Sequence, residues 1–581
     1  MAAQEEKNST ETPESRPESA AEAVKRNSVQ LRGTIGETLR ETEAARFSDS
    51  DEKLLKFHGT YQQYDRDTAT ERKKQKLDKD WSMMVRLRAP GGRLTAEQYL
   101  DLDAVSSAHA DGSLRITTRQ TIQFHVVPKD GLKPLIRGIN ETLLTTMATC
   151  GDIVRNVTAT PAPIRDAKHA ALNRLADRIS THFLPNTTAY HEIWLDDERV
   201  DEQRTVAEPL YGATYLPRKF KIGLAAPDDN AIDVLTNDIG IIALSEDSDI
   251  PERYLVCVGG GLGMTHNKPA TYPRLATPLL TVGDEEALIA ALEAIVKVQR
   301  DYGDRENRKH ARLKYLVQEQ GDTWMREQVE AYAGRSFDDP EPVPDLRIPD
   351  HLGWHEQGDG KRYIGIGIPS GRIKDGENGP YATALRGIVD RFRPTVILMP
   401  SQDIILADVD PADAPEIDAT LEEYGITRAE TLTPLRRWAL ACPALPTCGL
   451  ALTEAERVRP QIVDQVQARL DAHDLGNERI SLRITGCPNG CTRPYAGDIG
   501  IVGRTPGTYA LFVGGDFEGT RLNAQILDKV PMDKIGDRLD PLFAAYAAGR
   551  ADDESFGDWC NRQGVEALMA LADQSARQEA A

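Results

Sequence analysis

The sequence has little of several features that common classes of protein require. Its 581 residues carry 70 Lys and Arg against 91 Asp and Glu, so it lacks the basic excess with which proteins bind nucleic acid or anionic membranes. No uninterrupted apolar stretch reaches the length that spans a bilayer. The first residues, MAAQEEKNSTETPESRPESAAEAVKR, contain no apolar segment of the kind found in secretory signals. We therefore expect a cytoplasmic protein that binds neither nucleic acid nor membrane.

Cysteine is also scarce, and its distribution is uneven. The chain has seven cysteines, and four of them gather late in the sequence, at Cys442, Cys448, Cys487 and Cys491. Where thiols stay reduced, such a group is more often a metal site than a set of disulfides. Four thiolates can hold a tetrahedral zinc ion or a [4Fe–4S] cluster, and the wide Cys442–Cys448 gap favours the cluster. Unrelated buried or redox thiols are the third alternative.

What is present is the composition of a globular protein, 40% hydrophobic and 28% charged, with an internal repeat. MMVRLRAPGGRLT (83–95) resembles YIGIGIPSGRIKD (363–375), and LRITTRQTIQFHVV (114–127) resembles VILMPSQDIILADV (396–409). The repeat predicts a duplicated unit, each copy a small α+β module followed by a larger strand-and-helix module. We expect the two copies to face each other across a cleft.

The repeat and the composition of the connecting segments also predict domain boundaries. We expect a disordered tail at 1–28, an arm at 29–77 that wraps the body or a partner, and a linker at 336–350. The predicted domains are a first small one (78–150), a first large one (151–335), a second small one (351–430) and a second large one (431–575).

The two copies differ in their basic residues. We predict LRITTRQTIQFHVV to be one strand with these residues on one face: Arg115, Thr117, Arg119, Thr121, Gln123 and His125. The second copy has these residues instead: Ile397, Met399, Ser401, Asp403, Ile405 and Ala407. The first copy also has Arg86, which faces Gly365 in the second, and Arg155, Lys219 and Lys221. A solvated sheet face is the plain alternative for any one strand, but several basic clusters in one copy of an acidic chain predict a bound polyanion.

These stretches carry a resemblance to a known family. TCGLALTEAER, ITGCPNGCTR, LRITTRQTIQFH, RNV, YLPRKFK and FHGTYQQYDRD resemble the siroheme- and iron–sulfur-containing sulfite and nitrite reductases, from about residue 29 to the end of the chain. The resemblance implies an α+β fold of two pseudo-symmetric halves, each a ferredoxin-like half-domain plus a larger strand-and-helix domain. Siroheme and a [4Fe–4S] cluster would lie at the interface of the halves.

The resemblance also implies residue roles. The four cysteines would ligate the cluster, and Cys491 would in addition be the axial ligand of the siroheme iron, with Asn489 in the same loop. The acidic groups of siroheme would lie against the polar face of the first copy, at Arg115, Thr117, Arg119, Gln123 and His125. Substrate would be held by a set of four cations, Arg86, Arg155, Lys219 and Lys221.

The implied activity is the six-electron reduction of sulfite to sulfide in assimilatory sulfate reduction and cysteine biosynthesis. Lys221 favours sulfite, because nitrite enzymes of the family tend to carry asparagine there. A ferredoxin-dependent sulfite or nitrite reductase and a non-catalytic metal-stabilised scaffold are the alternatives. Since VGGGLGMTH (258–266) does not fit a dinucleotide fingerprint and no stretch resembles a flavin domain, we expect a separate NADPH-dependent flavoprotein to donate electrons, docked partly on the arm. Ferredoxin is the alternative donor.

Overall fold

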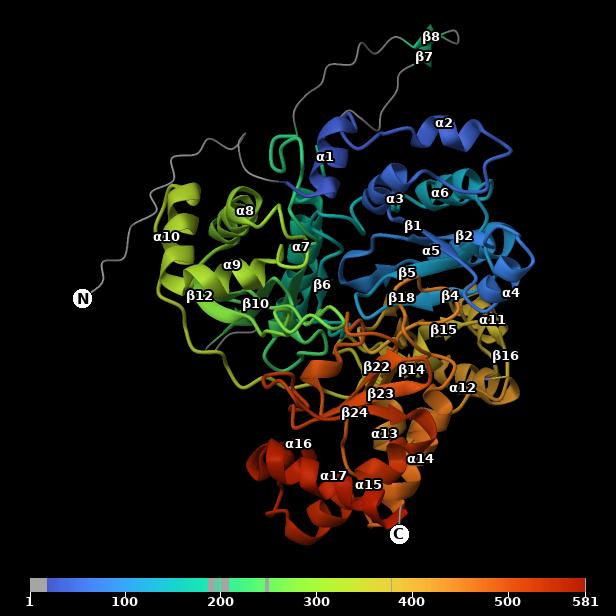
Figure 1. Cartoon of the computed structure of the whole chain (residues 1–581), viewed down its shortest axis with the longest axis vertical. Helices are drawn as coiled ribbons and strands as arrows, with labels where there is room; N and C mark the ends of the chain where they lie inside the picture. Colours follow the sequence, from blue (N-terminus) through green and yellow to red (C-terminus); the bar gives the residue numbers. More distant parts are fainter. Residues whose placement is uncertain are drawn as a thin grey trace.

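The computed structural model describes residues 18–186, 194–195, 198–199, 208–245, 250–377 and 379–579. Figure 1 shows the two small domains side by side, with the first large domain (green) beside them and the second (orange to red) below. Each of the four has a five-stranded sheet. No helix among the residues described is both long and apolar enough to cross a membrane.

The two small domains have the same strand order. The first sheet runs β1 (Thr60–Tyr64), β2 (Trp81–Arg86), β5 (Ile122–Val127), β4 (Leu114–Ile116), β15 (Arg372–Ile373). The second runs β13 (Gly353–Glu356), β14 (Arg362–Ile366), β19 (Ile404–Val409), β18 (Thr395–Leu398), β3 (Arg93–Leu94). Helices α5 (Ala96–His109) and α6 (Leu132–Glu141) belong to the first, and α11 (Tyr381–Phe392) and α12 (Ala414–Glu423) to the second. Apolar side chains of both domains form one hydrophobic core.

The two small domains exchange a strand. β15 of the second copy pairs with β4, and β3 of the first copy pairs with β18. Glycine precedes each exchanged strand because the chains approach closely there. A Cβ on Gly92 would lie 2.5 Å from Leu398 O, and one on Gly371 would lie 2.4 Å from Ile116 O, and both residues have positive φ.

The two large domains also match strand for strand. The first sheet runs β12 (Thr277–Val282), β11 (Arg253–Val258), β10 (Ile239–Leu244), β9 (Ile222–Ala225), β6 (Thr158–Ala159). The second runs β20 (Ala439–Ala441), β21 (Leu482–Thr485), β22 (Ile499–Thr505), β23 (Thr508–Val513), β24 (Ala524–Pro531). In each sheet three neighbouring strands are parallel and the rest are antiparallel. The strands β9 and β10 are buried along their whole length, as their unbroken apolar runs require, and β21 is buried as well although it contains Arg483 and Thr485.

Helices cover the two large sheets. The first large domain has α7 (Ala167–His182), α8 (Glu285–Tyr302), α9 (Leu313–Gln320) and α10 (Asp322–Ala333). The second has α14 (Arg459–Asp471), α15 (Ile535–Gly549), α16 (Phe556–Gln563) and α17 (Val565–Glu579). The two large domains have separate apolar cores.

Two local predictions are wrong. Residues 20–27, predicted as part of a disordered tail, form helix α1 (Ala20–Asn27), while residues 1–17 lie outside the described residues. LRITTRQTIQFHVV is not one strand but the hairpin β4–β5, closed by a turn in which Gln120 has a φ of 52°. Thr117 and Arg119 therefore lie at the turn and do not continue the sheet face that carries Arg115.

The predicted arm packs on the body. It contains α2 (Ile35–Arg40), α3 (Asp49–Leu55), β1 and α4 (Ala69–Lys74), and β1 is the outer strand of the first small sheet. The arm is therefore in part a structural element of the first half.

Candidate active site

The four clustered cysteines lie at one edge of the second large sheet. Cys442 follows β20, while Cys487 and Cys491 follow β21. Because β20 and β21 are parallel neighbours, their carboxyl ends lie at the same edge, and the two cysteine-bearing loops meet there. Cys448 completes the group from the loop after Cys442. Burial raises the pKa of the Cys442 thiol to about 12, and the nearby Cys491 and Cys448 add to the rise.

The cysteine sulfurs receive hydrogen bonds from their own loops. Gly486 N donates to Cys442 Sγ at 3.3 Å, and Thr485 Oγ1 lies 3.6 Å from the same sulfur. Asn489 Nδ2 lies 3.5 Å from Cys487 Sγ. Donors of this kind stabilise negative charge on thiolate ligands, as in iron–sulfur sites.

The four thiols lie close enough to affect one another's ionisation. No three His, Cys, Asp or Glu residues in the described ranges stand close enough together to hold a single metal ion. All four thiols nevertheless influence one another, since Cys442, Cys448 and Cys491 each raise the pKa of Cys487 in addition to its burial. Four thiols gathered in this way can serve as the ligands of a [4Fe–4S] cluster.

The first half contributes cations without carboxylate partners. Arg155 precedes β6, and Lys219 and Lys221 precede β9. Neither lysine ammonium has an ion pair or hydrogen-bond partner among the residues described. Burial lowers the pKa of Lys219 well below its usual value, and Arg155 lowers it further. Burial does the same to Lys221, with Arg119 as the largest neighbouring cause. Cations so crowded are stabilised by a bound anion.

Three arginines of the same half bind neighbouring residues through some of their N–H groups and leave other N–H groups without a partner among the described residues. Arg119 donates to Asn237 Oδ1 at 2.8 Å, and Arg155 Nη2 lies 3.3 Å from the Tyr61 hydroxyl. Arg86 Nη1 lies 3.3 Å from Cys150 Sγ. The Nε atoms of Arg86, Arg119 and Arg155 are buried without a hydrogen-bond partner in the described part of the chain. Such orphaned donors indicate a ligand with several acceptor atoms.

A row of polar side chains crosses the first small sheet. Register places Arg86 opposite Gln123, and Gln123 opposite Arg115. His125 follows on the same face of β5, and both of its buried ring nitrogens lack a partner among the described residues. Burial lowers the pKa of His125 well below its usual value, so this imidazole is neutral.

Arg115 is the member of this row whose charge is already balanced. Its Nε lies 3.2 Å from Glu456 Oε2, and Nη2 donates to Ala441 O at 2.9 Å. Arg372 lies opposite Arg115 in the sheet and binds the same carboxylate at 2.9 Å. Since Ala441 directly precedes Cys442, Arg115 supports the cysteine loop, and a contact with siroheme stays a prediction for this residue.

The site lies where the two halves meet. Thr118, at the tip of the β4–β5 hairpin, donates its hydroxyl to Cys491 O at 2.9 Å. Met264 N donates to Pro488 O at 2.9 Å, which fixes the loop that carries Asn489. Lys219 is close enough to Cys491 for the thiol to raise its pKa in opposition to burial. Cations of the first half and thiols of the second therefore share one site.

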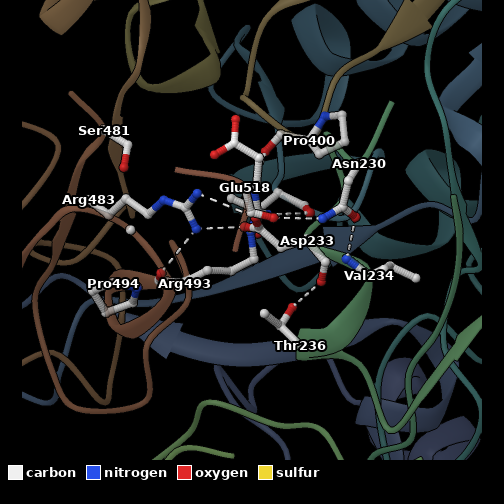
Figure 2. Close-up of polar contacts among 12 residues, drawn as sticks. Asn230, Asp233, Val234, Thr236, Pro400, Ser481, Arg483, Arg493, Pro494 and Glu518 are labelled. Atoms are coloured by element: carbon white, nitrogen blue, oxygen red, sulfur yellow. Dashed lines mark hydrogen bonds and ion pairs between the residues drawn. The ribbon is translucent and has the colours of Figure 1, made fainter. Parts of the chain in front are cut away.

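A buried ion cluster closes the interface nearby. Figure 2 shows Arg483 and Arg493 of the second half directed at Asp233 of the first. Arg483 Nη1 lies 2.6 Å from Asp233 Oδ2, and Arg493 binds the same oxygen. Asn230 adds a contact across the interface, donating to Glu518 O at 2.8 Å.

Sequence reasoning missed three residues of this region. Arg218 directly precedes Lys219 in the chain, and burial lowers its pKa to about 10. Tyr61 reaches Arg155 from the arm, and Cys150 contacts Arg86. Arg218 and Tyr61 stand inside stretches that carried the family resemblance, YLPRKFK and FHGTYQQYDRD, so the stretches were found but not these side chains.

Comparison with known sequences supports one family over most of the chain. Residues 175–337 and 434–579 match the "Nitrite and sulphite reductase 4Fe-4S domain". Residues 76–142 and 355–424 match the "Nitrite/Sulfite reductase ferredoxin-like half domain". The family matches thus fall in pairs on the two copies.

Individual relatives agree. The "Sulfite reductase [NADPH] hemoprotein beta-component" of Methylobacterium radiotolerans is 45% identical over 94% of this chain and 88% of its own length. The protein of the same name from Myxococcus xanthus is 44% identical over 94% of this chain and 97% of its own length. The "Sulfite reductase [ferredoxin]" of Synechococcus elongatus is 42% identical over 96% and 91%.

Among solved structures, Mycobacterium tuberculosis NirA has the same fold. The two structures superpose with a TM-score of 0.77 at 24% sequence identity, and the match covers 95% of this chain and 98% of NirA. The fold, the paired family matches and the cysteine loops agree, and the residues present fit siroheme and a [4Fe–4S] cluster. The chain belongs to the nitrite and sulphite reductase family.

Proposed function

We propose that this chain reduces sulfite to sulfide, a six-electron reaction, in assimilatory sulfate reduction and cysteine biosynthesis. The observation that carries the proposal is the meeting of unpaired cations from one half with four thiols from the other, at Lys219 and Cys491. Relatives at 43–46% identity over 94% of the chain bear the name sulfite reductase, which fits this chemistry.

The cations would hold the substrate. Sulfite is an oxyanion, and each cation about 4 Å away contributes on the order of a few kcal/mol at an effective dielectric near 20. The proposed holders are four residues of the first half, Arg86, Arg155, Lys219 and Lys221. Their free N–H groups can donate to the oxygens of sulfite.

The same residues would move protons. Reduction removes the oxygens of sulfite as water, so each must be protonated. Burial and neighbouring arginines lower the pKa of Lys219 and Lys221, and such lysines release protons more readily than exposed ones. We assign these two lysines as proton donors and Arg86 and Arg155 as holders of the anion.

The cofactors would lie between the halves. Cys442, Cys448, Cys487 and Cys491 would hold the cluster, and Cys491 would also bind the siroheme iron. Bound there, the pair supplies stepwise electron transfer to sulfite. The polar residues proposed to face the siroheme are Arg115, Thr117, Arg119, Gln123, His125 and Asn489.

A separate NADPH-dependent flavoprotein is the proposed electron donor. The arm passes over the cluster loop, where Arg66 N donates to Pro446 O at 3.1 Å and Arg66 Nη1 to Cys448 O at 3.2 Å. Asp67 binds Arg457 of the second half at 2.6 Å. A partner docked on the arm would thus stand beside the cluster, and ferredoxin is the alternative partner.

The test uses the purified holoenzyme with different donors. Reduced methyl viologen should support sulfide formation, whereas NADPH should remain unoxidised until the flavoprotein is added. Oxidation of NADPH by the chain alone, or activity with ferredoxin but not with the flavoprotein, would replace the proposed donor. The non-catalytic scaffold would require zinc in place of iron and no siroheme absorption bands. Cell fractionation tests the expected cytoplasmic location.

A further inference from the structure

Helix α1 buries two charged side chains although it was predicted to be part of a polar tail. Glu22 and Lys25 are each 1% exposed. A buried ammonium needs compensating partners, and Lys25 Nζ has three. It lies 2.5 Å from Glu22 Oε1 and 3.5 Å from Asp152 Oδ2, and it donates to Leu216 O at 2.9 Å.

Two of these partners belong to the loops that carry the site cations. Asp152 lies in the loop of Arg155, and Leu216 lies in the loop of Lys219. Backbone hydrogen bonds join the loops: Leu216 N donates to Asp152 O at 3.0 Å, and Arg155 N donates to Phe220 O at 2.9 Å. Lys25 therefore ties both cation-bearing loops to α1.

The buried carboxylate of Asp152 needs a neighbouring cation. This carboxylate is 4% exposed and lies near the anion site. Burial opposes its ionisation, but Lys25 and then Arg308 outweigh burial and lower the pKa of Asp152 to about 2. Asp152 also acts on Arg155 and Arg218, raising the pKa of each against the effect of burial. Without Lys25, more of its charge would be balanced by the site cations.

We propose that Lys25 is a positioning residue of the anion site. Helix α1 fixes the loops of Arg155 and Lys219 and satisfies Asp152, which leaves the site cations to the substrate. The identity of that substrate as sulfite rests on the proposed function, while the positioning of the loops does not. Arg308 supports the same arrangement from the other side, binding Asp152 at 2.7 and 2.8 Å.

The kinetic test compares variants of the holoenzyme with reduced methyl viologen as donor. Lys25→Met should raise the KM for sulfite about fivefold or more and change kcat less, because the lost charge acts on anion binding. Adding Asp152→Asn should restore much of the affinity, which a purely structural loss would not allow. Lys297→Met is the matched control, since it breaks a helical ion pair with Glu293 of 2.6 Å in the same domain.

Hydrogen–deuterium exchange gives the second readout. In Lys25→Met the amides of Leu216, Phe220 and Arg155 should exchange about tenfold faster, while those of β22 stay unchanged. Should Lys25→Met not accumulate as folded protein, Lys25→Gln, which removes the same charge but keeps a donor for Leu216 O, must raise the KM and speed the exchange in its place. If folded Lys25→Met keeps the wild-type KM for sulfite and the wild-type amide exchange rates, the inference is wrong. If the wild type reduces no sulfite, the proposed function fails, and exchange still decides the role of Lys25.

Discussion

Asp233 and Arg493 occupy equivalent positions in the two halves, 260 residues apart, and bind each other across the interface. Both have a left-handed backbone, with φ of 50° and 58°, and each begins the short helix before the third parallel strand of its sheet. The surrounding contacts repeat as well. Lys221 N donates to Asp238 at 2.9 Å, and Ser481 N donates to Asp498 at 2.9 Å. The local axis that relates the halves therefore passes close to this ion pair.

Removing the shared carboxylate should destabilise the fold strongly. Asp233→Ala leaves Arg483 and Arg493 buried and unpaired, and we expect a loss of about 3–5 kcal/mol in the free energy of unfolding. Urea unfolding followed by tryptophan fluorescence measures it. The control Asp464→Ala breaks an exposed pair with Arg436 and should cost less than about 1 kcal/mol. Equal losses in both variants would contradict a role for Asp233 in joining the halves.

Cys491→Ser should remove siroheme–cluster coupling and sulfite reduction together, because this thiolate is proposed to bind both cofactors. Electron paramagnetic resonance and turnover with reduced methyl viologen measure the two effects. Cys560→Ala, a change at a buried cysteine of the α16 helix, should leave both intact. A Cys491→Ser enzyme with full activity and an unchanged spectrum would disprove the shared ligand.

Lys221→Asn should shift the choice of substrate. The change removes a positive charge and keeps a donor, so binding of the dianion sulfite should weaken more than binding of nitrite. We expect the ratio of sulfite to nitrite turnover to fall about tenfold, the effect of roughly 1.4 kcal/mol. The exposed change Lys133→Asn is the control. A constant or higher ratio would exclude Lys221 from discrimination.

The pH dependence of stability should reveal Asp498. Burial raises the pKa of this carboxyl to about 6, against hydrogen bonds from Ser481 that lower it. The folded state therefore binds a proton more tightly than the unfolded state, and this group makes stability fall as pH rises from about 4 to 6.

Asp498→Asn should flatten that slope and raise stability above pH 6, by on the order of 2 kcal/mol. Thermal unfolding midpoints between pH 4 and 8 measure both effects. Asp552→Asn, at an exposed position, should follow the wild type at every pH. A parallel curve for Asp498→Asn would show that the carboxyl is not protonated in the folded protein.

The duplicated architecture and the cysteine group could be predicted because their cause is local. Alternating apolar residues recur in both copies, and Cys487 and Cys491 stand in the loop after a strand of alternating apolar and polar residues. The replacement of Arg86 by Gly365 was also visible in the aligned copies. A Cβ at Gly365 would lie 1.9 Å from His351 O, so the second copy has no room for a side chain there.

The wrong predictions have physical causes that cannot be seen in a short stretch of sequence. The Thr117–Gln120 turn has no Gly or Pro, so the alternation of LRITTRQTIQFHVV continues through it in the sequence. The burial of Lys25 depends on Asp152 and Leu216, which lie far along the chain. Arg115 could not be distinguished from a ligand-binding arginine because its partner, Glu456, belongs to the other half.

The exchanged strands β3 and β15 make each half of the duplicated chain incomplete by itself. A fragment that ends in the 336–350 segment lacks β15, so its first small sheet would keep an open edge at β4, and the remaining fragment would keep one at β18. Each fragment carries the strand that the other lacks. Two separately made fragments should therefore aggregate alone and recover the native assembly when mixed. The covalent link between the halves would then speed assembly without being required for the fold.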